Sequence, residues 1–184
     1  MTPGIFITKL AISCTEGDIV DLNKLVNELG IQQIEIPPHL LTMTDKARML
    51  CRKDEVLIGF NPNCTESERN TLRAIMVAHG LLYPDQLNSK GVSIDTFYLQ
   101  EIRRVRTSKD ILLATNISMP ERIRMKVRDL KFDCNIYAKK AQLLPTFVSC
   151  AASDSSVNFI LDKCFGDSGG VDIKMIPLLK NVRV

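Results

Sequence analysis

The chain has 184 residues, of which 45% are hydrophobic and 24% are charged, and its formal net charge is +3. These values are typical of a globular protein and exclude both wholesale disorder and a membrane-spanning bundle. The absence of Trp and an aromatic content of 5% disfavour a base-stacking platform for single-stranded nucleic acid. The six cysteines lie at least 13 residues apart and form no C-x-x-C pair, which favours reduced thiols in a cytoplasmic protein.

The first elements follow from local patterns. Residues 1–17 are apolar, but Lys9 falls inside the apolar run and not before it, so we expect an N-terminal strand or arm instead of a signal peptide. The residues from Thr15 to Asp18 can cap a helix, and the helical spacing of apolar residues from Ile19 to Leu29 predicts that helix. The alternation over 31–36 predicts a short strand.

The next region contains the strongest helix signal. Residues 39–54 show no clear pattern, whereas 55–60 is predicted to be a second strand. Thr65 and Glu68 then form a capping box, in which the hydroxyl and the carboxylate each accept from a free backbone N–H. The helix that follows, about 66–83, has a strongly apolar face and is predicted to be the central buried helix.

The second half is predicted to be mostly helical. A Pro- and Gly-containing loop is expected at 84–92, and the tail at 171–176 is expected to form a strand. Helical patterns cover 94–106, 108–117, 119–130, 135–144 and 154–163. The predicted fold class is therefore α+β, with a small sheet packed on a mainly helical body.

The charge is distributed unevenly along the chain. Residues 101–140 contain 11 Lys or Arg against 5 Asp or Glu, and the other residues are net negative. This stretch is either a solvated helical face or a surface for an acidic protein or nucleic acid. The residues of the candidate partner surface are Arg103, Arg104, Arg106, Arg122, Arg124, Lys126 and Arg128.

One short string matches an enzyme motif. The segment Gly166-Asp-Ser-Gly-Gly170 equals the sequence around the nucleophile of trypsin-like proteases. Those enzymes are double β-barrels with a long segment after the nucleophile, whereas this chain is predicted to be mainly helical and has 16 residues after Ser168. A triad is defined by geometry, so we interpret the string as a helix stop and turn.

An ordered series of segments carries a family resemblance. A leading helix ends at Leu29-Gly-Ile31, and the predicted strand Val56-Leu-Ile-Gly-Phe-Asn61 precedes the capped helix. That helix contains Arg73-Ala-Ile-Met-Val-Ala-His-Gly-Leu-Leu-Tyr83, and Lys109-Asp-Ile-Leu-Leu-Ala-Thr-Asn-Ile-Ser-Met-Pro120 follows. With these segments, residues 18–163 resemble the ImmA/IrrE family of zinc metallopeptidases, which accompany helix-turn-helix repressors in phages and mobile elements. The resemblance implies a zincin-like fold with 66–83 as the active-site helix.

The resemblance also shows where the family's chemistry is lost. It places His79 at the first zinc-binding histidine, Gly80 at the water-activating Glu and Tyr83 at the second histidine. Lys109 falls at the third ligand, or Asp110 after a shift of one residue. Glycine cannot act as a base and a cation disfavours Zn²⁺, so we expect no metal, no cofactor and no catalytic residue.

The resemblance therefore implies a catalytically inactive member that acts by binding. The expected partner is a helix-turn-helix transcription regulator, so the protein would be an anti-repressor or phage regulator in the cytoplasm, with no membrane association. Two alternatives stay open: a residual zinc-dependent peptidase, with a site rebuilt from His39, His79 and Asp110, and a regulator that binds DNA directly. The implied organisation is an arm at 1–17, a metallopeptidase-like domain at 18–131 and a C-terminal helical extension at 132–184.

Overall fold

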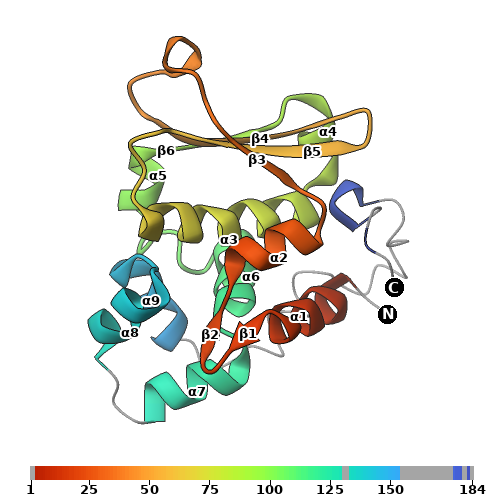
Figure 1. Ribbon diagram of the computed structural model, residues 1–184. Coiled ribbons are helices and arrows are strands. Elements are labelled where there is room, and N and C mark those ends of the chain that lie inside the picture. Colours follow the sequence, from red (N-terminus) through yellow and green to blue (C-terminus); the bar gives the residue numbers. More distant parts are fainter. Residues whose placement is uncertain (1–2, 130–132, 154–175, 180–181, 183–184) are drawn as a thin grey trace.

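The computed structural model describes residues 3–129, 133–153, 176–179 and 182, and Figure 1 shows its arrangement. The protein is α+β, as predicted, with a four-stranded mixed sheet, a two-stranded hairpin and a mainly helical body. The helices are α1 (Pro3–Ser13), α2 (Leu22–Glu28), α3 (Glu66–Leu82), α4 (Pro84–Ser89), α5 (Thr96–Gln100), α6 (Lys109–Ser118), α7 (Glu121–Asp129), α8 (Cys134–Ala141) and α9 (Pro145–Ser153), with the 3-10 turns η1 (Pro38–Leu40) and η3 (Pro177–Leu179). The strands are β1 (Thr15–Glu16), β2 (Ile19–Val20), β3 (Gln32–Glu35), β4 (Asp45–Arg52), β5 (Glu55–Phe60) and β6 (Val92–Asp95).

The four-stranded sheet has the order β3-β5-β4-β6. Strands β3 and β5 are parallel, whereas β4 is antiparallel to both β5 and β6. A two-residue turn joins β4 to β5, and Lys53 and Asp54 both have positive φ angles there, of 50° and 67°. Positive φ at both central residues is the conformation that suits a tight hairpin, although glycine or asparagine is the usual choice for it. Helix α3 runs across one face of this sheet (Figure 1).

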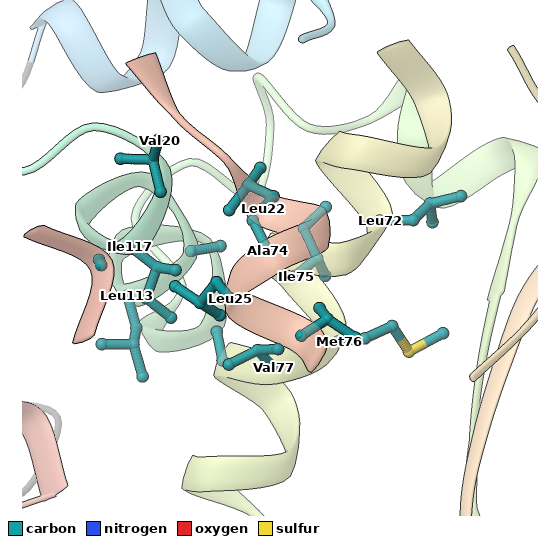
Figure 2. Close-up of a cluster of buried hydrophobic side chains, with 14 of the residues drawn as sticks. Val20, Leu22, Leu25, Leu72, Ala74, Ile75, Met76, Val77, Leu113 and Ile117 are labelled. Atoms are coloured by element: carbon teal, nitrogen blue, oxygen red, sulfur yellow. The ribbon is translucent and has the colours of Figure 1, made fainter. Parts of the chain in front are cut away.

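The prediction for the central helix is confirmed. Helix α3 begins after Thr65, and the capping box with Glu68 is present in both directions. On the side of the helical body, α2 and α6 contribute buried residues to the core around it, and Figure 2 shows Leu25 of α2 between α3 and Leu113 and Ile117 of α6. Met76 points away from α6 in the same view and is fully buried. The helix therefore shares its apolar surface between the sheet and the helical body.

The predicted N-terminal arm is wrong. Residues 3–13 form helix α1, and Phe6, Ile7 and Ala11 on it are buried in the core. The β-branched residues in this stretch favour a strand locally, but the burial of one helical face outweighs that preference. The residues from Thr15 to Val20 form the β1–β2 hairpin, and Asp21 supplies the cap of α2 instead of the predicted Thr15–Asp18 segment.

The rest of the chain follows the predicted order, with differences. The predicted strands at 31–36 and 55–60 correspond to β3 and β5, and α6, α7 and α8 match predicted helices, whereas α4, α9, β4 and β6 were not predicted. The expected helix over 94–106 is shortened to α5, because its first residues belong to β6 and 101–107 form turns. The predicted helix at 154–163, most of the predicted strand at 171–176 and the Gly166–Gly170 string lie outside the described residues. Within the described part of the chain, no helix combines the length and the hydrophobicity needed to cross a membrane.

Candidate functional site at the end of the central helix

The last turn of α3 presents two aromatic rings. His79 lies in that turn and Tyr83 forms its C-cap, and the two ring centroids are 4.7 Å apart at a tilt of 51°. Pro84 then starts α4, which places Gln86 over His79, with 3.0 Å between His79 Nε2 and Gln86 Oε1. Because an amide oxygen can only accept, Nε2 donates in this bond and Nδ1 faces the opposite side.

The other side of the imidazole faces helix α6. Asp110 lies in the first turn of α6, and its Oδ2 is 3.9 Å from His79 Nδ1, an ion-pair distance and not a hydrogen bond. The Tyr98 hydroxyl of α5 donates to the same oxygen at 2.6 Å. Asp95 positions Tyr98 by accepting from its backbone N–H at the start of α5. We call His79, Tyr83, Gln86, Tyr98 and Asp110 the His79 cluster.

Electrostatics fixes the protonation of two members of the cluster. Burial alone would raise the pKa of the Asp110 carboxyl, but His79, Ser108, Tyr98 and the backbone N–H of Ile111 favour the carboxylate more strongly and hold that pKa below its usual value. Burial and the hydrogen bond to Asp110 raise the pKa of the Tyr98 hydroxyl far above its usual value. Asp110 is therefore an anion and Tyr98 a permanent donor at neutral pH.

Gly80 packs closely against residues outside the His79 cluster. A Cβ atom at this position would lie 2.2 Å from Leu178 Cδ1 and 3.0 Å from Met49 Cε. Leu178 belongs to η3, whose residues are buried against α3 and β5. The resemblance assigns this position to a water-activating Glu. Here Leu178 of η3 and Met49 of β4 occupy the space that a side chain would need, so any residue larger than glycine would displace them.

The donor set does not fit a zinc peptidase centre. Of the two possible third ligands, Asp110 lies beside His79, whereas Lys109 is exposed. The site rebuilt from His39, His79 and Asp110 is not formed: His39 is exposed on η1, and the described residues contain no group of three or more His, Cys, Asp or Glu side chains that could hold a metal ion. The cluster offers one imidazole, one carboxylate and phenols, without a free carboxylate to activate water.

The predicted basic surface divides into two parts. Arg103, Arg104 and Arg106 are exposed in the turns between α5 and α6, and Arg103 and Arg106 lie near Cys150 of α9, where they oppose the stronger effect of burial, which raises the pKa of its thiol. The other part lies on α7, where Arg122 and Arg128 are exposed and Lys126 forms a 2.7 Å ion pair with Asp18.

One predicted member of the basic surface is wrong. Arg124 is only 4% exposed and points into the protein from α7, so it cannot contribute to a partner surface. Helical spacing explains the error, because Arg124 lies on the same face of α7 as the buried Val127, three residues on.

Sequence reasoning also missed two members of the His79 cluster. Tyr98 was predicted only as part of the helix over 94–106, and Gln86 was assigned to the loop at 84–92. Neither belongs to a motif, and each reaches the cluster through packing between elements that lie apart in sequence. In comparisons with known proteins, the chain matches no family model, no curated protein and no solved structure.

Proposed function

We propose that this chain is a catalytically inactive, metallopeptidase-like regulatory protein that acts in the cytoplasm by binding a protein partner, a helix-turn-helix transcription regulator. The observation that carries the proposal is the pairing of His79 and Asp110. The ImmA/IrrE resemblance places His79 at a metal-ligand position on one helix. After a shift of one residue it places Asp110 at a metal-ligand position on another helix, and the two side chains lie 3.9 Å apart. A zincin-like scaffold would bring these positions together in this way.

The same cluster supports the proposal that the protein is not a peptidase. The position of the second histidine carries Tyr83, and Gly80 packs against Leu178 instead of presenting a base. The Asp110 carboxylate accepts from Tyr98, and His79 Nε2 donates to Gln86. A network whose polar groups already contact one another is suited to holding helices together and not to activating water.

The exposed surface beside the cluster supports a protein partner with negative charge. We call Phe97, Arg103, Arg104 and Arg106 the α5–α6 surface, since all four are exposed and lie within ten residues of one another in sequence. Aromatic and arginine side chains are the residues most enriched in protein interfaces, because they combine apolar area with directional donors. An acidic patch on the regulator would complement this surface.

The test begins with affinity capture from native cells and continues with the purified regulator. We expect the purified pair to form a complex in which the regulator keeps its intact mass. Replacement of Arg103, Arg104 and Arg106 by Glu should weaken that complex about tenfold or more, mainly through a slower on-rate. The matched control reverses three exposed lysines outside this surface, Lys9, Lys24 and Lys90, and should leave the affinity within about twofold.

The alternatives give different results in the same assay. A residual peptidase would shorten the regulator, and the shortening would stop when His79 is replaced by Ala. A regulator that binds DNA directly would bind without the partner, with an affinity that falls steeply as salt rises, because phosphate contacts release counterions. Either result would contradict the proposal.

A further inference from the structure

A pocket of about 550 Å³ lies away from the His79 cluster and shares no residue with it. It is formed where α1 and the β1–β2 hairpin meet the junction of α6 and α7. This volume falls within the range of small-molecule sites, which typically measure about 300–1,000 Å³. The residues that matter for its chemistry are Thr8, Ile12, Asp18, Asn116, Glu121 and Arg122.

Asn116 is the distinctive member of the lining. It is only 1% exposed, and its Nδ2 donates to Thr8 Oγ1 at 3.2 Å, while the Thr8 hydroxyl donates to the backbone oxygen of Gly4. Its amide oxygen accepts no hydrogen bond from any residue that the structure describes, and one hydrogen of Nδ2 also stays unused. Asn116 is not among the fully buried polar groups without a partner, so its amide oxygen is accessible to a molecule that enters the pocket.

The charges around the pocket cancel. Lys126 neutralises Asp18 through the 2.7 Å ion pair, and Arg122 lies close enough to lower the pKa of the Asp18 carboxyl further. Glu121 and Arg122 are adjacent and of opposite sign. The lining therefore gives no net preference for an anion or a cation. Ile12, Pro120 and Ile123 supply apolar surface beside the buried amide.

From these features we propose that the pocket binds a neutral, amphipathic small molecule that carries a carboxamide. The carboxamide N–H would donate to Asn116 Oδ1, and its oxygen would accept the unused hydrogen of Asn116 Nδ2. The apolar body would lie against Ile12 and Ile123. The inference does not depend on the proposed function, because a different part of the molecule carries it.

Matched probes of one size test the proposal. Isobutyramide, isobutyrate and isobutylammonium share their carbon skeleton and differ in head group. Titration of isotope-labelled protein with isobutyramide should shift the side-chain amide resonances of Asn116 saturably at millimolar concentration, as expected for a ligand of so few atoms. The two charged probes should bind at least about fivefold more weakly, since each loses hydration and can make only one of the two hydrogen bonds with the Asn116 amide.

Substitution then tests the role of the amide. Asn116→Leu should weaken isobutyramide binding about three- to tenfold, as expected when one or two neutral hydrogen bonds are lost. Asn88→Leu, at an exposed asparagine of α4 outside the pocket, should leave binding unchanged. If Asn116→Leu does not fold, Thr8→Val removes the hydroxyl that orients Asn116 and should also weaken binding.

Three results would overturn the proposal. The first is the absence of any saturable shift at Asn116 in the unaltered protein. The second is binding of a charged probe as tight as that of isobutyramide. The third is an Asn116→Leu protein that is folded and binds isobutyramide with unchanged affinity.

Discussion

Helix α3 carries one polar network in each half, and the two differ in what their groups can do. In the N-terminal half, Arg73 donates through Nε to Gln33 at 2.8 Å and through Nη1 to Glu66 and Asn70, each at 2.7 Å. Its guanidinium carbon lies 5.3 Å from the centroid of the Phe60 ring. This network ties α3 to β3 and β5, and its central group cannot lose a proton or bind a metal.

The C-terminal half carries the His79 cluster, whose central groups are an imidazole and a carboxylate, side chains of the kinds that bind metal ions in proteins. The cluster joins α3 to α4, α5 and α6. The side chains of His79 and Asp110 are 19% and 13% exposed, whereas that of Arg73 is 8% exposed. Both networks contain hydrogen bonds that join α3 to neighbouring elements. A hydrogen-bonded network is therefore no sign of function by itself, and the chemistry and accessibility of its central group distinguish a candidate site from an anchor.

The largest expected effect on stability comes from placing a charge in the buried face of α3, the helix that carries both networks. Met76 lies between Arg73 and His79 on α3 and is fully buried. Met76→Asp should cost several kcal/mol, on the order of the whole stability of a small domain, because it buries a charge without a partner. Circular dichroism should show an unfolded protein. The control Met43→Asp, at a fully exposed methionine, should melt as the unaltered protein does.

The next effect concerns Gly80, which separates the cluster from η3. Gly80→Ala should cost about 1–3 kcal/mol, because the new methyl group overlaps Leu178. The clash should lessen when Leu178→Ala is added, so the double variant should be more stable than the sum of the single losses predicts. Denaturant unfolding measures all four proteins. Additive losses would show that Leu178 does not pack on Gly80.

The two networks themselves can be compared by removing each central group. Arg73→Met should cost about 2–3 kcal/mol, since it deletes charge-assisted hydrogen bonds from a buried site. His79→Ala should cost less, about 1 kcal/mol, because its bond to Gln86 lies at the surface and its pairing with Asp110 is longer. Equal losses in the free energy of unfolding, measured by chemical denaturation, would contradict the distinction between the Arg73 network as a structural anchor and the His79 cluster as a candidate site.

The last comparison concerns the pH dependence of stability at Asp110. Its pKa is lowered by folding, so the carboxylate contributes stability above the pKa of the unfolded chain, about 3.9, and this contribution is lost as the pH falls toward the folded value. Asp110→Asn should therefore destabilise the protein at pH 7, and the difference from the unaltered protein should shrink below about pH 4. Asp85→Asn, at an exposed position, should show no such trend. A constant difference across the range would contradict the assignment.

Local signals predicted the parts of the fold that local physics determines. The capping box of Thr65 and Glu68 fixed the start of α3, and helical spacing found α6, α7 and α8. Strand β4 was missed because small or weakly apolar residues such as Ala47 and Cys51 occupy one face, and because its hairpin turn lacks the expected glycine. Helix α1 was missed because its β-branched residues favour a strand until tertiary packing is included.

The candidate site was predictable only where it rests on one helix. His79, Gly80 and Tyr83 follow from the pattern of α3, and Asp110 was included as the alternative to Lys109. Tyr98 and Gln86 depend on where α5 and α4 dock, which no spacing in the chain encodes. The burial of Arg124 likewise follows from the orientation of α7 and not from its charge.

We propose that the His79 cluster does not perform zinc chemistry, and metal analysis tests this proposal most directly. The protein and its His79→Ala variant would be purified, exposed to excess zinc, desalted and analysed for zinc per chain. The account predicts far less than one zinc per chain, with the same value for both proteins. One tightly held zinc per chain that disappears in His79→Ala would contradict it and would restore the cluster as a metal centre.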